Sequence, residues 1–137
     1  MNKYLLDTNV VSETRKPRPH GGVLGWLNAQ QDEQLFLSAV TLGEIQAGIE
    51  RTRRQDPAKA QEIERWADQL AASYQILPMD TPCFREWGRI MDMRPDQLLE
   101  DAMIAATARV HGLIVATRNE RDFKRLDVRI LNPFNSR

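Results

Sequence analysis

Short apolar runs alternate with longer amphipathic stretches along the chain. The runs lie at residues 3–6, 34–40, 75–80, 113–117 and 128–131, and polar or turn-forming residues bound each of them. Brief apolar runs of this kind are typical of strands that are covered on both faces. Because these strands alternate with helical patterns, the sequence predicts an α/β fold whose central sheet has five mainly parallel strands.

Apolar residues at helical spacing predict the intervening helices. The expected helices cover residues 10–14, a segment that starts at 23, 41 to about 54, 57 to about 74, a segment that starts at 81, and 98–111. The loop sequence KPRPHGG at 16–22 separates the first two. The helix from Thr81 carries Phe84, Trp87 and Met91 as its apolar stripe, and Gly112 is expected to close the last helix in the left-handed conformation.

The composition bounds the class of protein. With 137 residues, 42% hydrophobic and 28% charged, the chain fits one compact domain, residues 1–137, with its own core. Nineteen basic and nineteen acidic residues balance, which argues against binding nucleic acid through bulk charge but allows a local basic patch. The single cysteine, Cys83, excludes an internal disulfide and a zinc cluster of thiolates.

The N-terminal segment has neither signal-peptide nor membrane-spanning character. Only Lys3 provides positive charge, and the apolar run that follows ends at Asp7. No stretch of the sequence reaches the length that a transmembrane helix needs. We therefore expect a cytoplasmic protein without a membrane partner.

The first predicted strand ends abruptly at Asp7. Open α/β sheets bind ligands at the carboxyl ends of their strands, so an acid at this position is a candidate metal ligand. The competing interpretation is a helix N-cap, because Asp, Thr and Asn all cap helices well. Asp7 alone leaves both interpretations open.

Two further acids lie on predicted helices. Glu44 follows the second strand and points away from the apolar stripe of its helix, so by itself it is most simply a solvated residue near a helix N-terminus. Asp101 is unusual because it shares a helix face with Ile104, Ala105 and Ala108. A carboxylate on an apolar face is unfavourable unless something pairs with it, which favours a functional role over a helix-dipole role.

A hydroxyl, an amide and a carboxylate follow the fourth predicted strand in the sequence ATRNERDF. Thr117 ends the strand, and Asn119 and Asp122 come directly after it. Thr117 or Asn119 could cap a short helix here, or the three side chains could line a cleft.

The acids carry more weight together than singly. Several carboxylates at one sheet edge repel one another and raise one another's pKa, and a divalent cation relieves that repulsion. Carboxylate oxygens without His or Cys suit a hard ion such as Mg²⁺ or Mn²⁺. Such ions activate water and stabilise charge on a phosphodiester, so the residues suggest metal-assisted phosphoryl chemistry.

Three blocks of the sequence resemble a known family. LLDTNVVSE, LSAVTLGEIQAGIE and EDAMIAATARVHGLIVATRNERDF are similar to segments of the PIN-domain ribonucleases, and especially of the VapC/FitB branch of bacterial toxins from toxin–antitoxin pairs. The resemblance runs almost the full length of the chain, through the closing LNPF.

The resemblance implies a three-layer α/β/α sandwich and Mg²⁺- or Mn²⁺-dependent cleavage of RNA by a water that attacks phosphorus in line. The family's acids match Asp7, Glu44 and Asp101 here, with Asp7 and Asp101 as direct metal ligands, and its small hydroxyl matches Thr117. For the fourth acid, many relatives have Asp where Asn119 stands, whereas this branch often uses the position of Asp122. We favour Asp122 as an outer ligand, with Asn119 nearby.

The resemblance also implies partners. These are a VapB-like antitoxin, whose C-terminal segment lies in a groove beside the active site, a second copy of the toxin in a homodimer, and operator DNA for the larger complex. RNA phosphates need cations, and three basic clusters are available: Arg15, Lys16 and Arg18; Arg51, Arg53 and Arg54; and Arg118, Arg121, Lys124 and Arg125. The first and third flank strand ends and favour RNA binding, whereas the second is more simply a solvated surface.

Two other functions compete with this interpretation. A phosphatase of the haloacid type would need a second acid two residues after the first, where Asn9 stands, and a Gly-rich phosphate loop is absent from the sequence. A non-catalytic PIN-like module that binds RNA or an antitoxin remains the alternative. The presence of Asp7, Glu44, Asp101 and Asp122 favours catalysis, because clustered acids reduce stability unless they are used.

Overall fold

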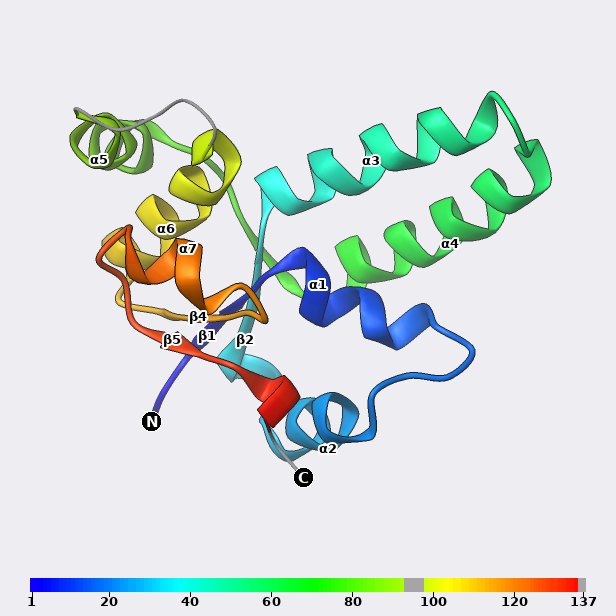
Figure 1. Cartoon of the computed structure of the whole chain (residues 1–137), viewed down its shortest axis with the longest axis horizontal. Helices are drawn as coiled ribbons and strands as arrows, with labels where there is room; N and C mark the ends of the chain where they lie inside the picture. The colour runs from blue at the N-terminus through cyan, green and yellow to red at the C-terminus, as the bar shows by residue number, and fades with distance from the viewer. Residues whose placement is uncertain (93–97, 136–137) are drawn as a thin grey trace.

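The computed structural model describes residues 1–92 and 98–135. Its strands are β1 (Tyr4–Leu6), β2 (Leu35–Ser38), β3 (Gln75–Leu77), β4 (Ile114–Ala116) and β5 (Ile130–Leu131), and they form one parallel sheet in the order β3-β2-β1-β4-β5 (Figure 1). All five strands were predicted. β2 ends at Ser38, as expected from the sequence, because the Ser38 hydroxyl caps the next helix, accepting from the Val40 N–H at 3.0 Å.

Helices connect the strands. They are α1 (Thr8–Val11), α2 (Gly21–Ala29), α3 (Ala39–Arg53), α4 (Pro57–Ser73), α5 (Thr81–Met91), α6 (Leu99–His111) and α7 (Glu120–Lys124), with 3-10 turns η1 (Ser12–Arg15), η2 (Asp32–Gln34) and η4 (Pro133–Asn135). The six expected helices are confirmed, and Gly112 ends α6 at φ 68° as predicted. A short helix after the fourth strand was one of two interpretations of this segment, and α7 is that helix, with Asn119 at its N-cap position but no side-chain cap hydrogen bond.

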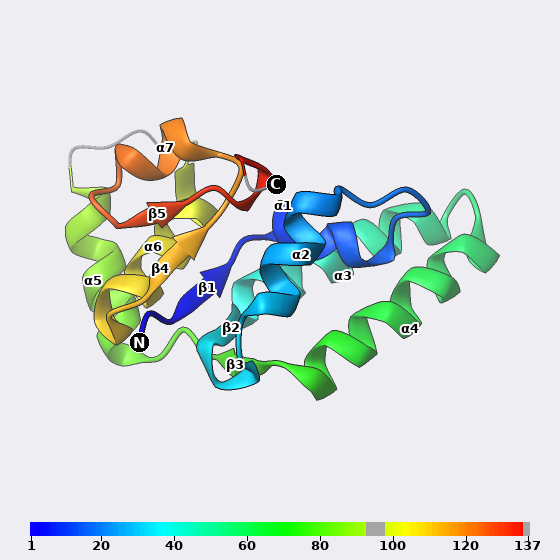
Figure 2. The same ribbon diagram turned by 90° about the horizontal axis from the view of Figure 1, so that it is seen from below.

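The sheet separates two apolar clusters. Tyr4 and Leu6 of β1 pack with buried residues of α2, α3 and α4, whereas Leu5 points the other way, toward α5, α6 and Phe123 of α7. Alternation of this kind is the geometry of a strand covered on both faces. Figure 2 shows the two sets of helices on opposite sides of the strands, which confirms the three-layer sandwich.

The apolar stripe expected on α5 faces the core in part, since Trp87 and Met91 pack against the buried cluster that includes Leu5. Cys83 and Ile90 are the buried residues of this helix, and Phe84 is 47% exposed. Trp87 is only partly buried and lies edge-on to Phe84, with ring centroids 6.2 Å apart. Of the predicted stripe, Phe84 therefore adds apolar surface, while Trp87 and Met91 cover the core.

The strand order creates a crevice at one sheet edge. β1 lies at the centre, and the chain proceeds from it to β2 on one side, whereas β4 lies on its other side and leads to β5. The connections that leave β1 and β4 diverge, and such a switch point is where open α/β sheets bind ligands. Within residues 1–92 and 98–135, no helix is long and apolar enough to cross a membrane.

Candidate active site

Asp7 lies at the switch point, directly after β1. Its Oδ1 accepts the N–H of Thr8 at 2.9 Å, so Asp7 is the N-cap of α1, as one of the two sequence interpretations proposed. The residue is only 6% exposed, which is unusual for a carboxylate that makes no ion pair among the described residues. Helix capping therefore accounts for the position of Oδ1 but not for that of Oδ2.

The second oxygen of Asp7 is held by two side chains. Thr117, fully buried at the end of β4, donates its hydroxyl to Oδ2 at 2.8 Å, and Asn9 donates its amide to the same atom at 3.3 Å. Burial raises the pKa of Asp7, and the hydrogen bonds from Thr117, Thr8 and Asn9 oppose that rise. These contacts fix the carboxylate in one orientation.

The residues after β4 form a chain of contacts that begins at Thr117. The Asn119 N–H donates to the Thr117 hydroxyl at 2.9 Å, and the Asn119 amide donates to Oδ2 of Asp122 at 3.0 Å. Asp122 thus joins the network of Asp7 through Asn119 and Thr117 rather than directly. Asn119 and Asp122, the two candidates for the position of the fourth acid, therefore belong to the same network.

Glu44 and Asp101 face this network from α3 and α6. Burial, followed by the charges of Asp7, Glu100 and Asp101, raises the pKa of Glu44 to about 7. Although Glu44 has an exposed surface, the walls around its carboxylate remove enough water to produce this shift. Burial, followed by Asp7, Asp122 and Glu100, raises the pKa of Asp101 to about 6.

The charges of the acids raise one another's pKa values, but the carboxylates do not meet at one point. Within the described residues, no three or more His, Cys, Asp and Glu side chains lie close enough to hold a metal ion as they stand. Their donor set of carboxylate oxygens nevertheless fits a hard divalent cation, because like charges that raise one another's pKa lack a positive partner.

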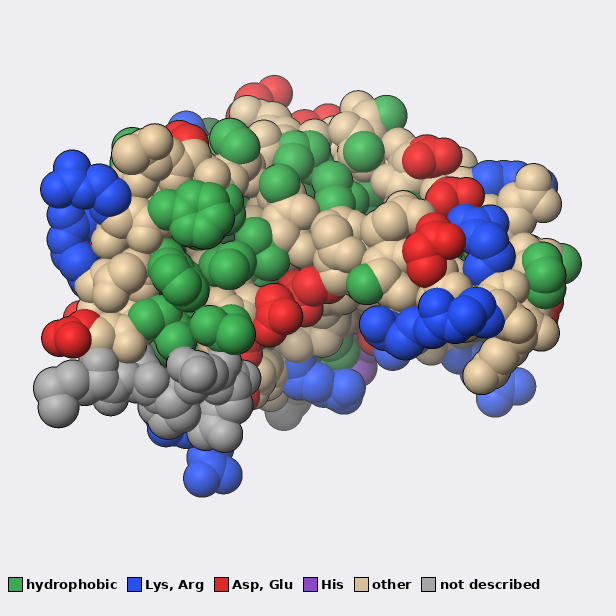
Figure 3. Space-filling view, turned by 90° about the horizontal axis from the view of Figure 1, so that it is seen from above, with side chains coloured by type: hydrophobic (Ala, Val, Ile, Leu, Met, Phe, Trp, Pro, Cys, Tyr) green, Lys and Arg blue, Asp and Glu red, His purple; other side chains and the backbone are tan. Residues whose placement is uncertain are grey.

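A cavity of about 650 Å³ opens beside the acids. Its lining residues come from α1, α3 and α6: Thr8, Val40, Gly43, Glu44, Ala47, Arg51, Glu100 and Met103. Figure 3 shows acidic side chains between a hydrophobic area over α5 and α6 and basic side chains toward the end formed by α3 and α4. The cavity is thus lined by two acids, Glu44 and Glu100, and by one cation, Arg51.

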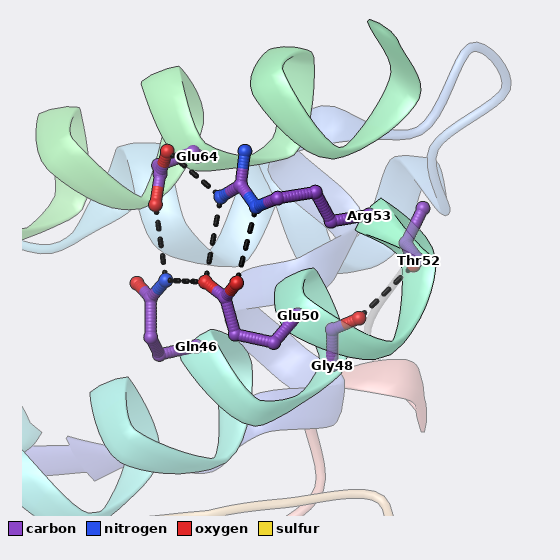
Figure 4. A network of polar contacts seen from close by, with 6 residues as sticks. All are labelled: Gln46, Gly48, Glu50, Thr52, Arg53 and Glu64. Carbon is purple, nitrogen blue, oxygen red and sulfur yellow. Dashed lines mark hydrogen bonds and ion pairs between the residues drawn. The ribbon is translucent and has the colours of Figure 1, made fainter. Parts of the chain in front are cut away.

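The basic cluster on α3 is divided. Arg53 donates to Glu50 and Glu64 and, with Gln46, ties α3 to α4 (Figure 4). Arg51 instead lines the cavity that contains Glu44. The interpretation of this cluster as structural surface therefore applies to Arg53 but does not account for the position of Arg51.

Two residues of the site region were not singled out from the sequence. Asn9 bridges Asp7 and the N–H of Arg118, which its Oδ1 accepts at 3.1 Å. Glu13 is 3% exposed and accepts from Lys16 and from the N–H of His20. An amide two residues after a strand-end acid is the signal that could have identified Asn9, and for Glu13 the only available signal is the Lys three residues later.

Comparison with known proteins identifies relatives over nearly the whole chain. The PIN domain family model matches residues 4–129. The toxin FitB of Neisseria gonorrhoeae is 34% identical, with 96% of this chain and 98% of the relative covered. The VapC ribonuclease Y4jK of Sinorhizobium fredii is also 34% identical, with 95% and 96% covered. A solved structure of FitAB bound to an IR36 DNA fragment is 30% identical with a TM-score of 0.73, and 98% of this chain and 97% of that chain are covered.

Proposed function

Because the chain belongs to the PIN-domain family and to the branch that contains FitB and VapC, we propose that it is the toxin of a type II toxin–antitoxin pair and a metal-dependent endoribonuclease. The observation that carries this proposal is the convergence of Asp7, Glu44 and Asp101 at the switch point, with pKa values that burial and their own charges raise. Acids whose pKa values are raised by burial and by neighbouring acids are typical of catalytic sites.

The proposed cofactor is Mg²⁺ or Mn²⁺. Asp7 and Asp101 would hold the ion directly, with Glu44 and Asp122 completing its surroundings, and all of these donors are oxygens. When bound, such an ion lowers the pKa of a water molecule and neutralises charge that develops on the phosphate.

The residues around the ion have separate roles. Thr117 and Asn9 hold Oδ2 of Asp7, so the carboxylate needs little rearrangement before it binds. Glu44 has a pKa of about 7, which suits a carboxylate that takes the proton of the attacking water at neutral pH. Asn119 orients Asp122 through its amide. No side chain needs to act as a covalent nucleophile.

The test is an RNA cleavage assay with purified protein freed of antitoxin. A pool of cellular RNA is incubated with Mg²⁺, Mn²⁺ or EDTA, and the products are mapped by end sequencing. We expect discrete cuts that need the metal and that disappear in Asp7→Asn and Asp101→Asn. Asp68→Asn, an isolated acid on the surface of α4, is the matched control and should cut like the parent.

The alternative function is a PIN-like module that binds RNA or an antitoxin without cutting. A folded parent that binds metal and RNA yet leaves every RNA in the pool intact would favour this alternative. Cleavage that survives in both Asp→Asn variants would instead point to a contaminating nuclease and would remove the support for the proposed site.

We further propose that the antitoxin binds in a groove beside the acids. A cavity of about 210 Å³ lies between α1, α3 and α4, and Glu44 is one of its lining residues. Ile45, Ile49, Ile63 and Trp66 give it apolar walls. These walls suit the apolar side of a peptide, and a cation on that peptide would reach Glu44 and block the site.

The assembly and location follow from the same proposal. The relative solved as FitAB on a DNA fragment supports a complex of this chain with its antitoxin on operator DNA. We propose that residues 1–137 form a single PIN domain, that two copies form a homodimer through the hydrophobic area over α5 and α6, and that the protein acts on RNA in the cytoplasm.

A further inference from the structure

Arg118 is tied to the candidate catalytic acid through the backbone. It follows Thr117, whose hydroxyl donates to Asp7, and its own N–H donates to Asn9, whose amide donates to the same oxygen of Asp7. The main chain at Arg118 is therefore fixed relative to Asp7 by two routes. One runs through Thr117 and the other through Asn9, and both end at the same carboxylate oxygen.

The side chain of Arg118 is fixed as well. Its guanidinium lies over the ring of Phe134, 4.3 Å from the centroid. The N–H of Phe134 donates to Asn132 at 2.9 Å, and the Asn132 amide donates to Glu120 at 3.0 Å. The His20 ring packs edge-on against Phe134, with centroids 5.2 Å apart. The C-terminal turn η4 thus holds an aromatic platform beneath the guanidinium.

The charge of Arg118 is not neutralised by a direct partner. In the described part of the chain, no carboxylate forms an ion pair with Arg118, and the residue is exposed. The buried Glu13 lies near enough to feel its charge but already accepts from Lys16 and from the His20 N–H. By contrast, Arg53 is held by Glu50 and Glu64.

We propose that Arg118 binds a phosphate of the RNA beside the scissile bond and that Phe134 is a positioning residue for its guanidinium. Stacking on an aromatic face uses the plane of the guanidinium and leaves its N–H groups at the edge, where they match phosphate oxygens. Such a contact would place the phosphodiester next to Asp7 without neutralising the acids. This inference rests on the proposed nuclease function.

The experiment measures RNA binding separately from cleavage. A short fluorescein-labelled single-stranded RNA of mixed sequence is titrated with full-length protein in EDTA, by fluorescence anisotropy, over a series of KCl concentrations. Arg118→Ala should weaken binding about tenfold, the loss typical of one hydrogen bond to a charged group. It should also reduce the slope of log K against log salt by about 0.7, the value for one contact to a single strand.

Two variants separate charge from position. Phe134→Leu keeps the charge and an apolar side chain, so it should weaken binding while the salt slope stays at the parent value. Arg54→Ala removes the same charge at the turn between α3 and α4 and should bind RNA like the parent. Thermal unfolding of each variant checks that the fold is intact.

The outcomes are distinct. Equal affinity and equal salt slope for Arg118→Ala and Arg54→Ala, in a parent that cuts RNA with metal, would overturn the role of Arg118 alone. A parent that neither binds nor cuts RNA would overturn the nuclease function and this inference together. Unchanged RNA binding with lost antitoxin binding would assign Arg118 to the protein partner and would also overturn the inference.

Discussion

Asp7 shows how one residue serves the fold and the site at once. Its Oδ1 caps α1 through the Thr8 N–H, and its Oδ2 takes hydrogen bonds from Thr117 and Asn9. These contacts oppose the effect of burial on its pKa. The capping and ligand interpretations of a strand-end acid are therefore compatible, because a carboxylate has lone pairs for both.

Glu44 should reduce the stability of the metal-free protein, and Glu44→Gln should raise it. Since burial and neighbouring acids raise the pKa of Glu44 to about 7, its ionised form is disfavoured in the fold. The parent should lose stability as pH rises from the ordinary Glu pKa of 4.5 to about 7, so the gain from Glu44→Gln should grow over this range, be complete above it and vanish below it. A gain of about 0.5 kcal/mol is reasonable for partly exposed charges.

Urea denaturation of parent and Glu44→Gln at several pH values in EDTA measures this effect. Asp68→Asn, which removes an isolated acid from α4, should show no such pH-dependent gain. An equal gain at pH 5 and pH 8 would mean that repulsion among the acids is not its source.

Glu13 should have the opposite pH dependence. Its pKa is lowered, chiefly by the hydrogen bond from Lys16 and also by the His20 N–H and Arg118. The ionised form is favoured in the fold, so its contribution is present at neutral pH and is lost as pH falls through the lowered pKa. We expect Glu13→Gln to reduce the free energy of unfolding by about 1–3 kcal/mol at pH 7.

The deficit of Glu13→Gln should shrink in acid, where the parent carboxylate is also protonated. Chemical denaturation at pH 7 and at about pH 3.5, below the ordinary Glu pKa, measures both. Lys16→Met removes the partner and should reproduce part of the loss. A deficit that is the same at both pH values would show that packing, rather than charge, accounts for the effect.

The sequence pointed to the acids and to Thr117 and Asn119 beside them, but not to the second side chain that holds Asp7, Asn9. Asp7 was recognisable because a charge ends a buried strand, and Asp101 because it shares a face with small apolar residues. The bridge from Asn9 to Arg118 joins positions 109 residues apart, so no local pattern could reveal it. The burial of Glu13 likewise depends on how the loop to His20 folds back over it.

At the scale of elements, the strands were predictable because each is a short apolar run between polar residues. On α5 the predicted stripe was right in part, because Trp87 and Met91 pack against the core whereas Phe84 is exposed. The fully buried residues of this helix are Cys83 and Ile90, which the predicted stripe did not include. Periodicity identifies an apolar face but cannot tell whether the core or another chain covers it. α7 has only five residues, too few to show a period.

The α3–α4 pair offers an element-scale test of the antitoxin groove. Gly48 lies within α3, lines this groove, and a Cβ added there would meet only an Arg51 nitrogen at 3.7 Å. Gly48→Ala should stabilise the protein by up to about 1 kcal/mol, because glycine is unfavourable inside a helix. Gly48→Phe should fill the groove and weaken antitoxin binding by about tenfold or more, while Gly48→Ala leaves binding unchanged.

Calorimetric titration with the cognate antitoxin, next to RNA cleavage by the free toxin, measures both consequences. Cleavage by the free Gly48→Phe toxin is the control for damage to the site, because Thr8 and Glu44 line both this groove and the cavity that contains Glu100 and Arg51. Unchanged antitoxin affinity in Gly48→Phe would place the partner elsewhere on the toxin.

At the scale of the whole molecule, the strand order assembles the site. Asp7 follows the central strand and Thr117 follows its neighbour, while α3 and α6 bring Glu44 and Asp101 from the two helical layers. Each acid comes from a different connection, so the site forms only when the complete sandwich is folded. This arrangement also leaves the surface of α5 and α6 directly beside the acids (Figure 3).

That surface should be the homodimer interface. Among the described residues, the exposed large apolar side chains are Met1, Phe84, Leu99 and Val110, and the last three lie on α5 and α6. A concentrated apolar patch on a soluble domain marks a contact surface, and a second copy offers the same patch to cover it. Phe84→Glu buries a charge in that contact and should convert the dimer to a monomer in sedimentation velocity.

Ala72→Glu introduces the same charge on an exposed position of α4 and should leave the dimer intact. If the dimer also aligns two acid sites into one RNA-binding surface, the Phe84→Glu monomer should bind RNA more weakly than Ala72→Glu does, because it loses the second set of contacts. A Phe84→Glu protein that remains dimeric would exclude the α5–α6 surface as the interface. A monomer that binds RNA as tightly as the dimer would instead show that each site works alone.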